Sequence, residues 1–289
     1  MADPVQMQSA ASPAREAWQM FIRSSVSIAG LSMLGLILLM SLFGPMLYDI
    51  DPFATSGAPL SPPFTPDLPL GTDQIGRDIL AGIVNGGRTT LAVGAAAALL
   101  SLGIGITLGA LAGYYGGLVD DVLMRVTEFF QVLPALLFAM VLVTLFTPTL
   151  ATITIAIGVV SWTGVARLTR GEFLKLRHME FVTAERAIGA DNARIIWRVI
   201  LPNALPPLIV SAAFAVGAAI LFEAGLSYLG LGDPNTMSWG LMIGSSRNYI
   251  LDAWWPVTFP GVMIFLTVLS VALISDGLNQ ALNPKLRER

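Results

Sequence analysis

The chain has 289 residues, of which 55% are hydrophobic and 12% are charged, against roughly 25% charged residues in soluble domains. Together with a mean hydropathy of +0.73, this composition predicts an integral membrane protein. The net charge of −3 gives no indication of nucleic-acid binding, and the lack of cysteine excludes disulfides and thiolate metal or redox sites.

The first 25 residues are polar and are expected to form an N-terminal tail. The apolar stretch that follows is too long for the hydrophobic part of a signal peptide, so it is predicted to be an uncleaved span. A helix needs about 20 mostly apolar residues to cross a membrane, because each residue rises only about 1.5 Å. Six stretches qualify: residues 26–48, 89–113, 123–147, 149–167, 205–229 and 256–275.

The basic residues predict the orientation of these spans. All of the 16 basic residues except Arg77, Arg88 and Arg247 fall on one side of the predicted membrane. Short cytoplasmic connections are rich in Lys and Arg, so this side is predicted to be the cytoplasm. An even number of spans then places both termini there, including the tail 283–289.

The first extracytoplasmic connection has two predicted parts. Six prolines between residues 52 and 69 favour an extended, polyproline-like chain. A short helix is then expected from about Thr72 to Gly86, with Ile75, Ile79 and Ile83 on one face. It would lie either at the membrane interface or against the outer rim of the bundle.

Glycines recur every four residues in the second span, at Gly105, Gly109, Gly113 and Gly117. This spacing lines one helix face with residues that allow another backbone to approach closely. The partner of this glycine stripe could lie in the same chain or in a second subunit. Pro134 in the third span and Pro260 in the sixth are expected to kink their helices.

The sequence lacks the motifs that would supply energy or catalysis. There is no Gly-Lys pair, hence no P-loop for ATP, and neither G-x-S-x-G nor H-E-x-x-H occurs. The single histidine, His178, falls in a cytoplasmic connection. Glu128 and Glu223 are the candidates for ion coupling, but both lie toward the ends of their spans.

The connection between the fourth and fifth spans is unusually polar for this chain. A first helix is predicted from about residue 171 to Ile188, ending at Gly189, where a left-handed cap needs no Cβ. Asp191 or Asn192 can cap a second helix, which Pro202 is expected to interrupt. The result would be two helices joined at a defined corner.

The second helix mixes apolar and basic residues, with Trp197 between Arg194 and Arg198 and four β-branched residues nearby: Ile195, Ile196, Val199 and Ile200. Such a surface suits a groove on another protein. It equally suits anionic lipid, or packing back onto the bundle.

This connection resembles the "EAA" loop of ABC-importer permeases, with the pattern E-A-A-x-x-x-G followed later by I-x-L-P. Gly189, Leu201 and Pro202 match in spacing, and Val199 stands where the family has isoleucine. Further stretches resemble the dipeptide and oligopeptide C-type branch: "LGTDQIGRDIL" at 70–80, "GYYGG" at 113–117, "EAGLSYLGLG" at 223–232, "SWG" at 238–240 and "SDGLNQALNP" at 275–284.

The loop departs from the family pattern at its acidic position. Thr183 replaces the family glutamate, Ala184 is kept, and Glu185 replaces the second alanine. Positions 183 and 185 are about 200° apart on a helix, so Glu185 points to nearly the opposite face. Glu180, one turn earlier, lies nearer the vacated face. Leu68 also replaces the histidine that the family usually has before "PLGTD".

The resemblance implies a type I importer permease fold with cytoplasmic coupling helices. It implies a tail over 1–25, a first span with the Pro-rich segment over 26–85, a permease core over 86–282 with a coupling loop at about 170–203, and a tail over 283–289. The coupling residues it implies are Glu180, Thr183, Ala184, Glu185, Gly189, Asp191, Ile195, Leu201 and Pro202.

The resemblance also implies partners in a bacterial inner membrane. These are a homologous permease, two ATPase subunits that bind ATP and Mg, and an extracytoplasmic solute-binding protein, with surrounding lipid and without nucleic acid. The chain itself would be no enzyme and would hold neither cofactor nor metal. The implied cargo is a di- or oligopeptide, or nickel or glutathione. The alternative is a self-contained secondary transporter or channel.

Overall fold

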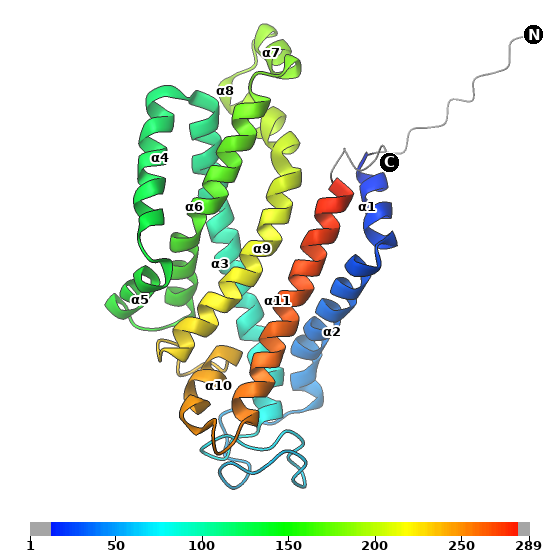
Figure 1. Cartoon of the computed structure of the whole chain (residues 1–289), viewed down its shortest axis with the longest axis vertical. Helices are drawn as coiled ribbons and strands as arrows, with labels where there is room; N and C mark the ends of the chain where they lie inside the picture. Colours follow the sequence, from blue (N-terminus) through cyan, green and yellow to red (C-terminus); the bar gives the residue numbers. More distant parts are fainter. Residues whose placement is uncertain (1–12, 283–289) are drawn as a thin grey trace, which may run out of the picture.

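The computed structural model describes residues 13–282, which form an elongated bundle of helices with no β-strand in that range (Figure 1). The helices are α1 Pro13–Arg23, α2 Ser25–Leu47, α3 Ile79–Tyr115, α4 Gly117–Val132, α5 Ala135–Leu145, α6 Leu150–Leu176, α7 Glu180–Ala187, α8 Asn192–Arg194, the π-helix η1 Ile195–Ile200, α9 Leu201–Tyr228, α10 Trp239–Ser246, the 3₁₀ helix η2 Arg247–Tyr249 and α11 Trp255–Leu282.

Among the described residues, five helices are long and apolar enough to span a membrane on their own: α2, α3, α6, α8 to α9 taken together, and α11. The pair α4 and α5 forms a sixth candidate span, bent by 87°. The all-α class is thereby confirmed, although the third span is broken rather than kinked. The break falls at Leu133 and Pro134, where the backbone becomes extended.

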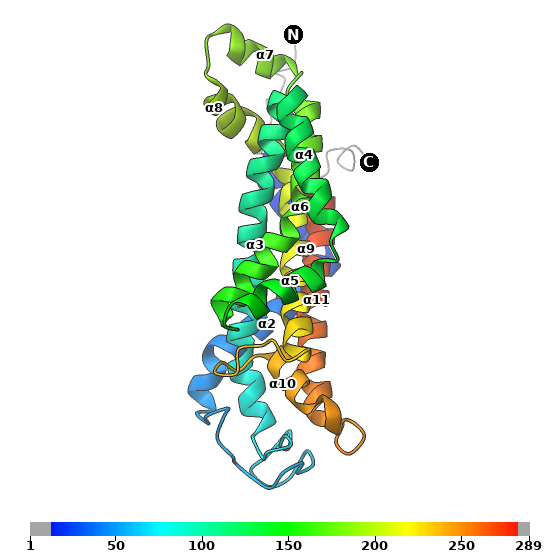
Figure 2. The same ribbon diagram turned by 90° about the vertical axis from the view of Figure 1, so that its left-hand side faces the viewer.

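The long helices pack around α3 and α6, which lie side by side along most of α6. Helix α9 covers this pair, α11 packs on α9 and α2, and α1 packs on α11. The corner formed by α7 and α8 stands at one end of the bundle, and residues 49–78 with α10 lie at the other (Figures 1 and 2). We call these the inner and outer ends, after the predicted orientation.

The short helix expected over residues 72–86 does not exist as a separate element. The Asp78 side chain accepts hydrogen bonds from the amides of Leu80 and Ala81, and this N-cap starts α3 at Ile79. The helix then continues through Gly86 into the second span, so it crosses the boundary expected between residues 85 and 86. Ile75 lies outside the helix.

The outer segment 49–78 is a compact series of turns rather than an extended polyproline chain. Leu60, Phe64 and Asp67 have positive φ values, which polyproline geometry excludes. The Thr72 hydroxyl donates to the Ala58 carbonyl at 2.6 Å and accepts from the Ser61 amide at 2.8 Å. The segment is therefore folded onto itself by side-chain and backbone hydrogen bonds.

Pro260 does not interrupt its helix, because α11 runs through it from Trp255 to Leu282. The predicted N-terminal tail 1–25 is partly helical, because Pro13–Arg23 form α1. The predicted tail 283–289, with Lys285, Arg287 and Arg289, lies outside the described residues.

Candidate coupling site

The corner at the inner end is built on Gly189. Its φ of +88° lies in the left-handed region, and no atom lies within 4 Å of where a Cβ would stand. The amide of Gly189 donates to the Arg186 carbonyl, and that of Ala190 donates to the Glu185 carbonyl, both at 3.0 Å. This pair of bonds is the Schellman motif, which ends a helix cleanly. The predicted left-handed cap is confirmed.

The first limb of the corner is shorter than expected. Helix α6 continues to Leu176, so residues 171–176 belong to the fourth span, and α7 starts only at Glu180. The Arg177 side chain lies at the break and donates to the carbonyls of Gly113 and Tyr114, at 3.0 and 3.4 Å. This contact fixes the start of the corner to the inner end of α3.

The second limb also differs from expectation. Asp191 occupies the N-cap position, but its side chain makes no capping hydrogen bond. The Asn192 side chain instead accepts a hydrogen bond of 2.7 Å from the Tyr114 hydroxyl on α3. The predicted capping position is thus confirmed, whereas the predicted side-chain cap is wrong.

Pro202 does not interrupt this limb, because the chain is helical both before and after it. Residues Ile195–Ile200 form a π-helical stretch, and Pro202 then occupies the first turn of α9. Proline is tolerated in the first turn of a helix, because the amide hydrogens of that turn have no acceptor within the helix. The coupling limb and the fifth span therefore form one unbroken path from Asn192 to Tyr228.

The apolar side of the corner packs back onto the bundle. Val182 of α7 and three isoleucines, Ile195, Ile196 and Ile200, are at most 2% exposed. They form a core with residues of α3, α6 and α9, namely Ala110, Tyr114, Phe173, Ala204 and Leu208. Of the three interpretations left open for this limb, packing onto the bundle accounts for these isoleucines. Trp197, Arg194 and Arg198 remain exposed.

The opposite side of α7 is exposed. Glu180, Thr183 and Ala184 share this side, and Ile188 at its end is 76% exposed. Among the residues described, Glu180 makes no ion pair. Glu185 lies on the other side, half-buried, with Oε2 at 3.7 Å from the Arg194 guanidinium. The structure therefore separates the two carboxylates, one facing outward and one tying the two limbs together.

The glycine stripe packs against α6 of the same chain. A Cβ would approach α6 atoms within 2.6 Å at Gly105, 2.3 Å at Gly109 and 2.6 Å at Gly113. The first three glycines thus let α3 and α6 approach closely, which settles where their partner lies. Gly117 does not belong to the stripe, because α3 ends at Tyr115 and Gly117 starts α4.

Neither acidic residue proposed for ion coupling has a suitable position. Glu128 is an exposed member of an i,i+3 pair with Arg125 at 3.3 Å. Glu223 is 1% exposed and accepts hydrogen bonds of 2.8 Å from the hydroxyls of Ser227 and Ser238. It joins α9 to the N-terminus of α10. Residues 18–282 contain no cluster of three or more metal-ligating side chains.

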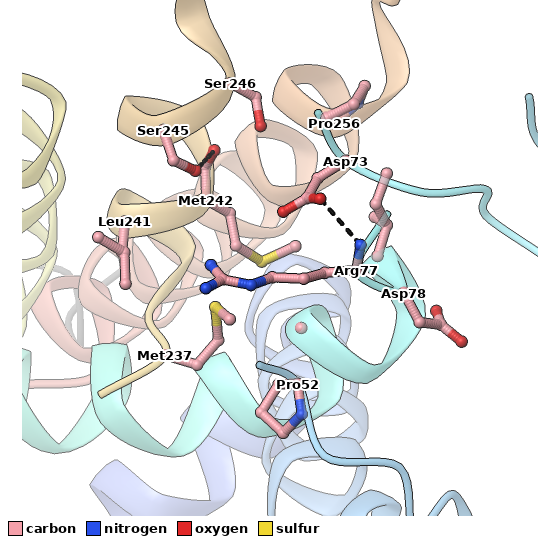
Figure 3. A pocket seen from close by; sticks show the side chains of 12 residues that line it. Pro52, Asp73, Arg77, Asp78, Met237, Leu241, Met242, Ser245, Ser246 and Pro256 are labelled. Atoms are coloured by element: carbon pink, nitrogen blue, oxygen red, sulfur yellow. Dashed lines mark hydrogen bonds between the residues drawn. The ribbon is translucent and has the colours of Figure 1, made fainter. Parts of the chain in front are cut away.

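The outer end holds a small pocket around Arg77. The Arg77 side chain extends between Met237 and Met242 (Figure 3), with its guanidinium 5.0 Å from the centre of the Phe53 ring. The pocket has a volume of about 20 Å³, which is room for about one water molecule. Arg77 therefore anchors the outer segment near α10, and the pocket is too small for a transported solute.

The sequence matches two family models. Residues 105–288 match the binding-protein-dependent transport system inner membrane component, and residues 12–67 match the N-terminal TM domain of oligopeptide transport permease C. The chain belongs to this permease family. The first match includes the corner and α9 to α11, and the second ends inside the compact outer segment.

Curated relatives align with almost the whole permease. The di/tripeptide transport system permease protein DppC of Pseudomonas aeruginosa is 39% identical, over 96% of this chain and 93% of its own length. The oligopeptide transport system permease protein OppC of Bacillus subtilis is 35% identical, over 95% and 90%. The glutathione transport system permease protein GsiD of Pectobacterium atrosepticum is 34% identical, over 97% and 94%.

A solved structure confirms the permease fold. A chain of the MetNI methionine ABC transporter, in an inward-facing conformation, aligns with a TM-score of 0.55 at 18% identity. The alignment covers 69% of this permease and 95% of that chain. The expected ABC-importer permease fold is thereby confirmed. The roles assigned to the individual coupling residues remain predictions.

Proposed function

We propose that this permease is the membrane subunit of an ATP-driven importer of di- or oligopeptides in a bacterial inner membrane, with both termini in the cytoplasm. The names of the relatives support this cargo, since those at 39% and 35% identity transport di-, tri- or oligopeptides. The chain has no P-loop and no catalytic motif of its own. Partner ATPase subunits would therefore bind the ATP and Mg, and this chain would hold no cofactor.

The proposed complex contains a homologous permease, two ATPase subunits and an extracytoplasmic solute-binding protein, with lipid around the spans. Shifting a gate from about 1:99 to 99:1 takes about 5.5 kcal/mol of differential binding. That energy must enter from an ATPase and reach the spans through a rigid contact. The corner suits this role because it is packed on α3 and α6 and continues directly into α9.

The observation that carries this assignment is the division of α7 into two sides. Val182 is fully buried against the bundle, while Glu180, Thr183 and Ala184 face outward. A partner that pushes on the outward side moves the buried side with it, because well-packed cores transmit displacement. We assign Glu180 as the carboxylate that meets the ATPase, and Glu185 as an internal tie.

Site-directed crosslinking tests this assignment. The chain has no cysteine, so Ala184→Cys introduces a single thiol on the outward side of α7. We expect it to crosslink to a thiol in the groove of the co-expressed ATPase, with a yield that changes when ATP is added. Leu118→Cys, exposed at the start of α4 at the same inner end but outside the corner, is the matched control. Equal and ATP-independent yields from both positions would contradict the assignment.

Reconstitution tests the transport function and its alternative. We expect dialanine uptake into liposomes only when the permease pair, ATPases, binding protein and ATP are all present. Uptake by this chain alone under an ion gradient would instead support a secondary transporter or channel. The 34% identical relative named for glutathione makes glutathione the second candidate cargo. Nickel, which the family resemblance also implies, is the third. The degree to which glutathione or nickel inhibits dialanine uptake ranks these candidate cargoes.

A further inference from the structure

A charged surface lies on α4 and α6 in the inner half of the bundle. It comprises Arg125, Glu128 and Gln131 of α4 with Arg167 of α6, and we call these four residues the α4–α6 polar face. None of them belongs to the corner or to the glycine stripe. The family resemblance and the coupling role leave this face unexplained.

The polar face lies in the inner part of the predicted spans, and Gln131 is its deepest residue. Phe130, next to Gln131, contacts Trp162 with ring centres 5.5 Å apart. The Trp162 carbonyl in turn lies 2.8 Å from the Cβ position of Gly105. Gly105 is eight residues, or about 12 Å, from the inner end of the predicted span 89–113. Gln131 is therefore level with an apolar part of α3, whereas Glu128 and Arg125 lie three and six residues nearer the inner end.

These side chains nevertheless point away from the protein. The Arg125 and Glu128 side chains are 84% and 61% exposed, and Arg167 is exposed as well. A charged side chain that faces lipid costs about 2.5 to 3.5 kcal/mol at the centre of a span and less toward its end, where these residues lie. Such residues usually face a water-filled path or other protein, so lipid is a poor neighbour for this face.

Three residues of this face, Arg125, Glu128 and Arg167, line a hollow whose size and charge suit a small zwitterion. The hollow has a volume of about 770 Å³, within the range of about 300–1,000 Å³ typical of small-molecule sites. Its walls carry both signs of charge, with Asp121 and Glu128 beside Arg125 and Arg167. A short peptide presents one ammonium group and one carboxylate at its ends, which both kinds of wall residue can meet.

Arg167 is the cation that is free to bind a carboxylate. The neighbouring Arg170 is held by Asp120 through two contacts of 2.5 and 2.6 Å. Arg167 donates only to the neutral Gln131 amide oxygen, at 2.9 Å, and has no carboxylate partner within the described part of the chain. A guanidinium matches a carboxylate with two parallel hydrogen bonds.

We propose that the α4–α6 polar face is a contact site for the peptide in transit, with Arg167 binding the peptide carboxylate and Glu128 its ammonium group. This inference rests on the proposed peptide-importer function. The site is open and mixed in charge, so binding is weak. Weak, successive contacts suit a path, because a transported solute must also leave each site.

A transport experiment tests the role of Arg167 in the complete reconstituted complex with dialanine as cargo. We expect Arg167→Gln to lower maximal uptake about tenfold, as for loss of one charged hydrogen-bond partner. ATP hydrolysis stimulated by the loaded binding protein should persist, so fewer peptides cross per ATP. The control Lys175→Gln changes another exposed basic residue of α6, beyond the hollow, and should transport normally. Unchanged uptake by Arg167→Gln overturns the inference.

A labelling experiment identifies what covers the face. Met124→Cys places a single thiol in the hollow and leaves its charges intact. In the complete complex, a charged, membrane-impermeant thiol reagent should label it, and dialanine with binding protein should slow the labelling. Protection in the complex without peptide would mean that the second permease covers the face. Labelling by a lipophilic maleimide alone would mean lipid contact. Either result overturns the inference, whereas absence of dialanine uptake by the wild-type complex would refute the proposed cargo.

Discussion

The Glu185 carboxylate and the Arg194 guanidinium lie 3.7 Å apart, and this ion pair joins the two limbs on either side of the Gly189 corner. The pair leaves Glu180 as the carboxylate on the outward side of α7. Glu185 lies 60° around the helix from the buried Val182, whereas Glu180 is 160° away from it. The two acidic residues therefore have separate tasks, and their substitutions should have separate effects.

We expect Glu180→Arg to weaken coupling without destabilising the permease, because the side chain is exposed and makes no ion pair within residues 18–282. Peptide-dependent ATP hydrolysis by the reconstituted complex should fall several-fold while the purified permease keeps its melting temperature. Glu185→Ala should cost at most about 1 kcal/mol, as for other partly exposed ion pairs. If Glu185→Ala uncoupled the complex and Glu180→Arg did not, the assignment would be reversed.

Gly189→Val should uncouple transport from ATP hydrolysis. A β-branched residue resists the φ of +88°, at a cost of about 1–2 kcal/mol, so the corner shifts or frays. No atom lies within 4 Å of the added Cβ, which makes conformation the only direct cause. Gly171→Val is the matched control, since Gly171 has equally open surroundings inside α6. Uptake and ATP hydrolysis, compared at equal membrane levels, measure the effect.

Gly109→Ala should destabilise the bundle itself. The added Cβ would lie 2.3 Å from the Ala166 carbonyl oxygen, so α3 and α6 must move apart. Overpacking of this kind costs about 1–3 kcal/mol. Thermal unfolding in detergent measures the loss. The control is Gly103→Ala in the same helix, where the added Cβ meets no atom within 4 Å, so this variant should be neutral or slightly stabilised. Equal melting temperatures for the two variants would argue against close α3–α6 packing.

Glu223→Ala should lower the free energy of unfolding by about 1–3 kcal/mol, because the buried hydroxyls of Ser227 and Ser238 lose their shared acceptor. Glu223→Gln keeps an acceptor oxygen and should lose less. Detergent melting curves compare the two. Glu223→Gln should also retain peptide uptake. If this variant had normal stability but no peptide uptake, that result would indicate proton coupling through Glu223.

Much of the fold follows from local sequence properties. The long apolar stretches predicted the spans, since hydrocarbon demands helices of a certain length with internal hydrogen bonding. Gly189 predicted the position of the corner, because few other residues accept a left-handed cap. The spacing of Gly105, Gly109 and Gly113 predicted a close helix contact. These features depend on one segment at a time, so sequence alone determined them.

Tertiary contacts decided the rest. The Tyr48 hydroxyl donates to the Asp78 carboxylate at the start of α3, and the Tyr114 hydroxyl donates to the Asn192 side chain, which could otherwise have capped α8. Periodicity revealed that Ile195, Ile196 and Ile200 share an apolar side, yet only packing against α3, α6 and α9 showed that this side is buried. The same packing decides that Glu180, and not Glu185, lies on the outward side of α7. A side chain's neighbours across the bundle set its exposure, and those neighbours are far away in sequence.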